Sequence, residues 1–211
     1  MSALIIGSGS NLDKDIFVLE NLNIEYVICA DGGLEKAEKL ELIPNIIIGD
    51  LDSVNKLVLK KYLDMNIELI KYPSEKNYTD MELAIEHAIE KGFKNIILIG
   101  ATGSRLDHTI ANVMLIEKYY KKGIHIQVID NNNLVQIVVN SIEIINKKDY
   151  FVSIVPITDS IEVVSLIGFK YPLNKVNVKR GSTLCVSNQI INEKGTIILG
   201  KGAGLVFISK D

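Results

Sequence analysis

Short runs of apolar residues, each ended by glycine or polar residues, recur through the first 130 residues of the chain. Unbroken β-branched runs are typical of strands buried on both faces, as in a parallel sheet. Apolar residues at helical spacing lie between these runs and predict the intervening helices. The expected strands cover residues 3–7, 24–30, 46–48, 67–71, 95–99 and 124–129, and the expected helices cover about 12–22, 34–40, 54–65, 80–91 and 107–122.

The pattern changes after residue 133, where short strand-like runs follow one another with turns between them and without a helical segment. These runs cover residues 134–139, 142–145, 151–155, 161–167, 176–178, 183–187, 196–199 and 205–209. The alternation of strands and helices in the first part predicts an α/β fold with a doubly wound, mostly parallel sheet. The second part predicts a small all-β domain, an antiparallel sandwich. We place the domain boundary between residues 133 and 134, giving domains 1–133 and 134–211.

Composition narrows the class of protein without identifying a substrate. The 211 residues are 47% hydrophobic and carry 23 Lys and Arg against 26 Asp and Glu, a net charge of −3. The absence of a basic excess argues against nucleic-acid binding. Apolar runs stay well short of a membrane span, and the N-terminus lacks the pattern of a signal peptide. Cys29 and Cys185 stand alone in apolar runs, which indicates buried thiols and a cytoplasmic protein.

Two carboxylates follow the expected strand at 46–48, after Gly49. In open α/β sheets, ligands bind just beyond the carboxyl ends of the strands. If the strand continues past Gly49, Asp50 and Asp52 point the same way and repel each other unless a cation lies between them. Oxygen ligands of this kind suit Mg²⁺. The alternative is a polar loop in which one of the two aspartates caps the next helix.

Two further strand ends carry candidate binding groups. The turn at 7–11 is rich in Gly and Ser, and its backbone N–H groups can bind phosphate, but a tight turn is the favoured interpretation because the dinucleotide and P-loop fingerprints are both incomplete. Asp31 ends the second strand, where an acidic residue can hold a ribose hydroxyl or a base edge. Asp31 also suits a helix cap, and the two roles are compatible.

Polar residues at the starts of two expected helices complete the set of candidate site residues at the strand ends. Thr79 and Asp80 open one helix, either as a simple helix N-terminus or facing the ligand beside Asp50 and Asp52. Arg105 lies in a glycine-containing loop and offers a planar fork to phosphate oxygens. The alternative is a surface ion pair of Arg105, with Asp107 capping the next helix.

The acidic strand ends and the single Arg together suit a metal–phosphate ligand better than a bare anion. Mg²⁺ would bridge carboxylates and phosphate oxygens, and Arg105 would stabilise the negative charge that develops on the phosphate during transfer. The sequence has no Ser–His or Cys–His pair at a suggestive spacing, which argues against covalent acyl transfer. These residues therefore indicate an α/β protein that handles a Mg–nucleotide, with the acceptor unidentified.

The same residues resemble the motifs of the thiamine pyrophosphokinase family, in the family's order and over nearly the whole chain. The matching segments are Asp31-Gly32-Gly33, residues 44–53, 75–80, 103–108 and 168–173, and Ser187-Asn188. This resemblance implies transfer of pyrophosphate from ATP to the hydroxyl of thiamine, giving thiamine diphosphate and AMP. It also implies an α/β catalytic domain, a β-sandwich that binds thiamine and dimerises, and a homodimer with the active site near the interface.

The resemblance also implies roles for individual residues. It assigns Mg²⁺ to Asp50, Asp52 and Asp80, and catalysis to Asp52, Asp80 and Arg105. The residues implied for nucleotide binding are Asp31, Gly32, Arg105, Asp107 and His108, and those implied for thiamine are Thr79, Tyr171, Ser187 and Asn188.

Three positions depart from the family pattern. Asn77 stands where the family commonly has Asp, Gln189 where Glu is usual, and Tyr171 where some members carry Trp. The first two favour an alternative in which the protein is a non-catalytic nucleotide or thiamine sensor. A second alternative is a related ATP-dependent transferase with another alcohol as acceptor.

Overall fold

The computed structural model describes residues 1–13, 22–52, 54–73, 75 and 77–211. The chain divides into two compact units, unit 1 at Met1–Asn131 and unit 2 at Asn132–Asp211. The division lies two residues before the expected boundary at 133. Within the described ranges, no helix is both long and apolar enough to cross a bilayer.

Unit 1 contains a parallel sheet in which the neighbouring strands follow the order β4-β3-β2-β1-β5-β6. Its strands are β1 (Ser2–Ile6), β2 (Ile24–Ala30), β3 (Ile46–Gly49), β4 (Glu68–Lys71), β5 (Asn95–Ile99) and β6 (His125–Ile129). The order runs one way from β1 to β4 and the other way from β1 through β5 to β6. Ligands in such sheets bind where the order reverses, which here is between the ends of β1 and β5.

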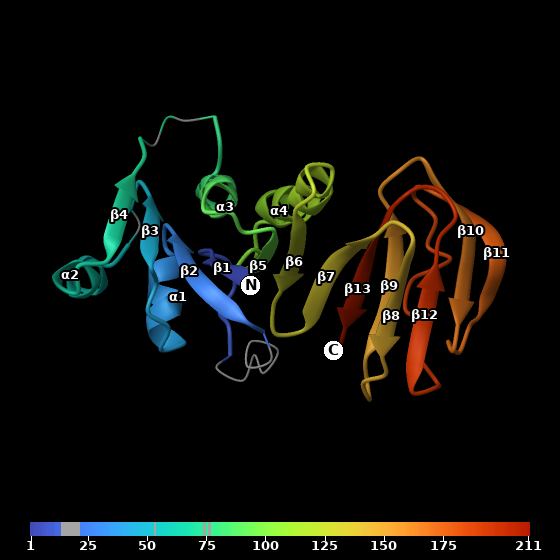
Figure 1. Ribbon diagram of the computed structural model, residues 1–211. Coiled ribbons are helices and arrows are strands. Elements are labelled where there is room, and N and C mark those ends of the chain that lie inside the picture. Colours follow the sequence, from blue (N-terminus) through green and yellow to red (C-terminus); the bar gives the residue numbers. More distant parts are fainter. Residues whose placement is uncertain (14–21, 53, 74, 76) are drawn as a thin grey trace. The chain divides into compact units, whose positions relative to one another are not determined.

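The described helices cover both faces of this sheet. They are α1 (Gly33–Lys39), α2 (Lys56–Asp64), α3 (Asp80–Glu90) and α4 (Leu106–Tyr120). Figure 1 shows α3 and α4 on one face of the parallel strands and α1 on the other. Central strand residues such as Ile5, Ile47 and Leu98 are fully buried, as expected for strands covered on both faces. The predicted α/β fold is confirmed, whereas the helix expected at about 12–22 falls mainly on residues outside the described ranges.

Unit 2 is built from two antiparallel sheets with the strand orders β7-β13-β9 and β11-β10-β12-β8. The strands are β7 (Asn133–Val138), β8 (Ser141–Ile145), β9 (Phe151–Pro156), β10 (Ser160–Ile167), β11 (Leu173–Lys179), β12 (Lys194–Ile198) and β13 (Gly204–Ser209). Both sheets contribute to one apolar core, for example Val206 of β13 and Ile197 of β12. The predicted antiparallel sandwich is therefore confirmed.

The strand expected at 183–187 is wrong. The segment forms turns, with the Val186 amide donating to the Thr183 carbonyl oxygen at 3.1 Å. Ser187 has a φ of 59°, in the left-handed region, which ends any extended run. The alternating apolar pattern is misleading because Cys185 enters the core while Leu184 and Val186 lie largely exposed.

Close backbone packing fixes the start of α1 against the end of β1. A Cβ added at Gly33 would lie 1.9 Å from the carbonyl oxygen of Ile6. An alanine at this position therefore requires the helix to move away from the sheet.

A polar cluster joins α3 to α4 on the face that they share. The buried Tyr119 hydroxyl donates to Glu86 Oε1 at 2.7 Å and to Glu82 Oε1 at 3.3 Å. Lys118 pairs with Glu82, and Lys122 pairs with Glu86 at 3.3 Å. Because Asp80 begins α3 and Arg105 precedes α4, this cluster holds together the two helices whose N-termini carry candidate site residues.

The pKa of Glu86 reflects this cluster. Burial raises the pKa, but the hydrogen bonds from Tyr119 and Lys122 and the charges of Lys122 and Lys118 outweigh burial and leave the pKa below its usual range. A carboxyl with a lowered pKa stabilises the fold above its unfolded pKa of about 4.3, and this stabilisation is lost as the pH falls through the folded pKa.

We expect Gly33→Ala to lower the free energy of unfolding by about 3 kcal/mol or more, because the added methyl group meets rigid backbone. Gly123→Ala is the matched control, since Gly123 has a φ of 79° and open space around it. That change should cost only about 1–2 kcal/mol from the backbone conformation. Urea denaturation measures both, and equal losses would contradict the packing described at Gly33.

We expect Tyr119→Phe to destabilise unit 1 by about 1 kcal/mol near neutral pH, a value reduced by water around Glu86, whose side chain is 40% exposed. The loss should be smaller at acidic pH, below the lowered pKa of Glu86, where the carboxyl is protonated. Tyr62→Phe is the control, because the Tyr62 hydroxyl donates to the neutral Leu42 carbonyl at 3.4 Å. Denaturation at both pH values should show pH dependence for Tyr119→Phe alone; equal pH dependence in the two variants would refute this account of the cluster.

Candidate functional site

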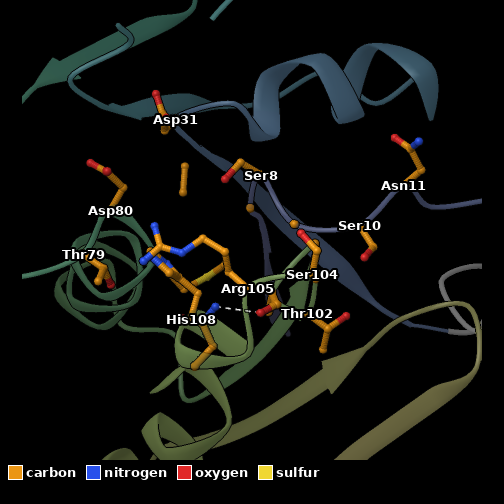
Figure 2. A pocket seen from close by; sticks show the side chains of 18 of the residues that line it. Ser8, Ser10, Asn11, Asp31, Thr79, Asp80, Thr102, Ser104, Arg105 and His108 are labelled. Atoms are coloured by element: carbon orange, nitrogen blue, oxygen red, sulfur yellow. Dashed lines mark hydrogen bonds between the residues drawn. The ribbon is translucent and has the colours of Figure 1, made fainter. Parts of the chain in front are cut away.

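A pocket of about 840 Å³ lies at the ends of β1 and β5 in unit 1. This is the place where the strand order reverses, as expected for ligand binding in an open α/β sheet. Figure 2 shows Asp31 and Asp80 toward one side and Ser10 and Asn11 toward the other, with Arg105 between them. The lining comprises residues 7–11, Ala30, Asp31, Asp50, residues 78–81, residues 100–105, His108 and Asn112.

At the floor of the pocket, the loop after β1 and the loop after β5 are joined by backbone hydrogen bonds, and this junction is called the seam. The amides of Gly7, Gly9 and Ser10 donate to carbonyl oxygens within residues 99–102 at 2.7–2.8 Å. These three amides are therefore committed to the fold, which agrees with the tight turn that the sequence favoured. The side chains of Ser8 and Ser10 also line the pocket.

Asp31 occupies the end of β2 with an unusual backbone conformation. Its φ is 46°, in the region that side-chain-bearing residues seldom adopt. Its amide donates to the Ile48 carbonyl oxygen at 2.8 Å, which ties the turn to β3. Gly32, rather than Asp31, is the N-cap of α1. Asp31 lines the pocket, whereas Gly32 is not part of its described lining.

Asp50 and Asp52 do not lie on one side of a continuing strand. β3 ends at Gly49, and Leu51 turns the chain with a φ of 63°. The Asp52 amide donates to Asp50 Oδ1 at 3.2 Å. The described lining of the pocket includes Asp50, while Asp52 is exposed outside it.

The alternative role as a helix cap also fails for both of these aspartates. Asn55 is the N-cap of α2, and its side chain accepts a hydrogen bond from the Leu57 amide at 2.9 Å.

Thr79 and Asp80 combine a structural role with a place in the pocket. The Thr79 hydroxyl accepts a hydrogen bond from the Glu82 amide at 3.3 Å and caps α3. Asp80 is the first residue of α3, where the helix dipole favours a carboxylate. Both residues line the pocket beside Asp50, so their place at the start of α3 also brings them to the pocket.

Arg105 forms the ion pair that the sequence offered as an alternative. Its Nη2 and Nε atoms donate to Asp107 at 2.5 and 3.2 Å, with both side chains exposed. The hydrogen bond from Arg105 is the main reason that the pKa of Asp107 lies below its usual value. Arg105 and His108 line the pocket, whereas Asp107 lies outside its described lining and is the second residue of α4.

Among the described residues, the pocket lining contains three carboxylates, Asp31, Asp50 and Asp80, and one cationic side chain, Arg105. Among the residues that the structure describes, no group of three or more His, Cys, Asp or Glu side chains is placed to hold a metal ion. Mg²⁺ commonly uses only one or two protein carboxylates together with phosphate oxygens and water. The oxygen donors of Asp50 and Asp80 therefore fit Mg²⁺ when a phosphate ligand supplies the rest.

Sequence reasoning missed several residues of the pocket. Tyr78 precedes the Thr79 cap, and Asn112 lies on α4 one turn after His108. The Asn112 amide donates to the Ala101 carbonyl oxygen at 2.7 Å and steadies the loop after β5. The spacing of four residues between His108 and Asn112, which places both on one helix face, is a signal that could have found Asn112.

A second group of expected site residues lies in unit 2. Asn188 is buried, its Oδ1 accepts from the amides of Tyr171 and Gln189 at 3.0 and 2.9 Å, and its Nδ2 donates to the Tyr171 carbonyl oxygen at 2.7 Å. Asn188 therefore holds the Tyr171 loop in place. Tyr171 is 60% exposed, and Lys170 Nζ lies 5.5 Å from the centroid of its ring. The Ser187 amide donates to Ser153 Oγ at 2.9 Å.

Known proteins resemble this chain over its whole length. A thiamine pyrophosphokinase of Bacillus subtilis is 36% identical over 210 residues, covering 99% of this chain and 98% of the relative. The crystal structure of thiamine pyrophosphokinase from Bacillus subtilis superposes with a TM-score of 0.91 at 30% identity, covering both chains completely. The structure of thiamin pyrophosphokinase from Geobacillus thermodenitrificans gives a TM-score of 0.85 at 31% identity, covering 100% of this chain and 98% of that one.

Family models agree with these similarities in both parts of the chain. The model of the thiamin pyrophosphokinase catalytic domain matches residues 19–128, and the model of the thiamin pyrophosphokinase vitamin B1 binding domain matches residues 140–203. The two matches fall in unit 1 and unit 2, respectively. The chain therefore belongs to the thiamine pyrophosphokinase family.

Proposed function

We propose that this protein is a Mg-dependent thiamine diphosphokinase that transfers the pyrophosphoryl group of ATP to the hydroxyl of thiamine. The products are thiamine diphosphate and AMP. The observation that carries the proposal is the pocket of unit 1, where Asp50 and Asp80 line the strand ends together with Arg105, in a chain of this family. A pocket of this kind suits a metal-bound polyphosphate better than an uncharged ligand.

The donor set supports a nucleotide bound through Mg²⁺ in unit 1. Asp50 and Asp80 would hold the metal ion, which would supply positive charge to offset the charge of the carboxylates and phosphates. The hydroxyls of Ser8, Ser10 and Ser104 line the same pocket and can donate to phosphate oxygens. We assign the ATP phosphates to this region.

Arg105 supplies the positive charge of the transfer step in this proposal. Its guanidinium is exposed and bonded to Asp107, so Asp107 fixes the direction of the fork while Arg105 remains accessible. A guanidinium aimed at phosphate oxygens stabilises the charge that accumulates on them as the bond to the leaving group lengthens.

The transfer itself needs one bond made and one bond broken. The thiamine hydroxyl oxygen bonds to the β-phosphorus, the bond from that phosphorus to the bridging oxygen of AMP breaks, and AMP leaves with its electron pair. We assign the hydroxyl proton to Asp80 rather than Asp52, because Asp80 lines the pocket and Asp52 is exposed outside it. A carboxylate in this position accepts the proton or orients the hydroxyl.

The thiamine-side assignment rests on unit 2 and on Thr79. Tyr171 offers an exposed ring for stacking, and Ser187 an exposed hydroxyl. Asn188 is assigned a positioning role, since its amide is engaged with the Tyr171 loop. Gln189 carries no charge where Glu is usual, so we expect the thiazolium cation to bind without an ion pair from this position.

The proposal extends to assembly and compartment. Exposed isoleucines of unit 2, such as Ile145, Ile167 and Ile191, supply apolar surface suited to a homodimer contact. Cys29 and Cys185 are buried free thiols, which suits the reducing cytoplasm.

We expect the purified protein to release AMP from ATP and Mg²⁺ only when thiamine is present. Pyrophosphoryl transfer yields AMP, whereas γ-phosphoryl transfer would yield ADP, so a coupled AMP assay with a no-thiamine control tests the reaction. Omission of Mg²⁺, with EDTA added, should abolish the signal. Thermal stabilisation by thiamine without AMP would instead favour the sensor alternative, and AMP release with another alcohol alone would favour a different acceptor.

We expect Asp80→Asn to lower kcat by about 100-fold or more, because it removes a metal ligand and the assigned proton acceptor together. Asn keeps the shape of the side chain and leaves the Thr79 cap intact. Asp64→Asn is the matched control, since Asp64 is an exposed residue at the end of α2. Steady-state kinetics with Mg²⁺ measure both, and near-normal turnover by Asp80→Asn would refute the assignment.

A further inference from the structure

Tyr78 is a pocket residue to which neither the motifs nor the proposed mechanism gives a role. It lies just before the Thr79 cap of α3 and lines the pocket, with 51% of its surface exposed. Of the described residues that line the pocket, only Tyr78 and His108 carry rings. His108 lies in the first turn of α4 close to Arg105 in sequence, where positive charge favours phosphate oxygens. Tyr78 is therefore the ring best suited to an uncharged part of a ligand.

The Tyr78 ring is supported from outside the pocket. Lys118 Nζ lies 5.6 Å from its centroid, and Lys118 does not belong to the described pocket lining. The same ammonium lies 5.3 Å from the ring of Tyr119 and pairs with Glu82, whose side chain is only 13% exposed. Lys118 is thus held by its ion pair with α3 and by its own place on α4, and it contacts the Tyr78 ring from there.

The supporting charge also limits what can stack on the ring. A cation over an aromatic ring is attracted to its π electrons. Because Lys118 already makes this interaction, a second cation such as a thiazolium gains less from the same ring and is repelled by the ammonium. An uncharged heterocycle suffers no such repulsion.

We propose that Tyr78, positioned by Lys118, is the stacking surface for the uncharged amino-substituted pyrimidine ring of a substrate. This inference rests on the proposed function, in which two substrates carry such a ring: the adenine of ATP and the aminopyrimidine of thiamine. The glycines, hydroxyls and carboxylates of the remaining lining serve the charged groups of the ligand. Tyr78 gives the pocket a means to distinguish a nucleotide or thiamine from a bare polyphosphate.

A single tryptophan tests this contact without turnover. The chain contains no Trp, so Tyr78→Trp places the only indole at the site. Its fluorescence is titrated separately with Mg–ATP, with thiamine and with Mg–tripolyphosphate, which has no ring. We expect saturable quenching by Mg–ATP or by thiamine, but not by Mg–tripolyphosphate. Tyr120→Trp is the control, because Tyr120 packs edge-on against His125 outside the described lining, and its emission should not respond.

Steady-state kinetics of the wild-type and substituted proteins identify which substrate, ATP or thiamine, supplies the ring that stacks on Tyr78. Tyr78→Leu should raise one KM by about tenfold, the lower part of the range for base–aromatic stacking, with kcat nearly unchanged. Tyr78→Phe should stay close to wild type. A rise in the KM of ATP identifies adenine, and a rise in the KM of thiamine identifies the aminopyrimidine.

The positioning role of Lys118 is tested by measuring the KM that responds to Tyr78→Leu. Lys118→Met should raise the same KM that Tyr78→Leu raises, by a smaller factor, and Lys118→Arg should leave that KM close to the wild-type value. Lys121→Met is the matched control, since Lys121 pairs with Glu117 on the same helix end.

Two results would overturn the proposal: unchanged KM values for both substrates in Tyr78→Leu, or equal quenching of Tyr78→Trp by Mg–tripolyphosphate. Failure of the proposed activity is a separate result, because it shows as absent AMP in the wild-type protein, while the fluorescence titration needs no reaction.

Discussion

The close approach of two backbone loops at the ends of β1 and β5 is the constraint on which the pocket depends. A Cβ at Gly9 would lie 2.1 Å from the Thr102 carbonyl oxygen, and one at Gly100 would lie 2.3 Å from that of Gly7. Only glycine allows this seam, and Gly100 also adopts a φ of 60°. The seam holds the loops at the point where the strand order reverses, so the side chains of Ser8, Ser10 and their neighbours face one cavity.

The charged side chains of the pocket lie on elements that are held by contacts other than the glycine seam. Asp31 and Asp50 lie on neighbouring strand ends that are linked by a backbone hydrogen bond, while Asp80 and Arg105 lie at the starts of α3 and α4. The buried Tyr119 hydroxyl and its carboxylate partners keep those two helices together. The carboxylates and the guanidinium are therefore held in place by the fold, and under the proposed function this reduces the reorganisation that binding and transfer require.

The sequence predicted the fold well because its strongest signals are local. Runs such as 46–48 and 95–99 can be buried on both faces only in a covered parallel sheet, and the structure has β3 and β5 there. The same local logic failed at 183–187, where Ser187 turns the chain, and at Asp52, which Leu51 directs out of the pocket. Both failures depend on left-handed residues other than glycine, which composition does not reveal.

Site residues could be predicted where they follow strand ends and not where tertiary contacts decide their role. Asp31, Asp50, Asp80 and Arg105 line the pocket as their positions indicated. The Asn188 side chain binds the backbone of Tyr171, 17 positions away, and Lys118 contacts the ring of Tyr78, 40 positions away. No spacing in the sequence signals either contact.

The central claim, that the pocket of unit 1 binds the Mg–nucleotide, is tested most directly by a crystal structure with Mg²⁺ and a non-hydrolysable ATP analogue. The account predicts the phosphates inside the pocket, with a metal ion held by the Asp50 and Asp80 carboxylates and the Arg105 guanidinium near the phosphate chain. An analogue bound outside this pocket, or phosphates without contact to either aspartate through the metal, would contradict it.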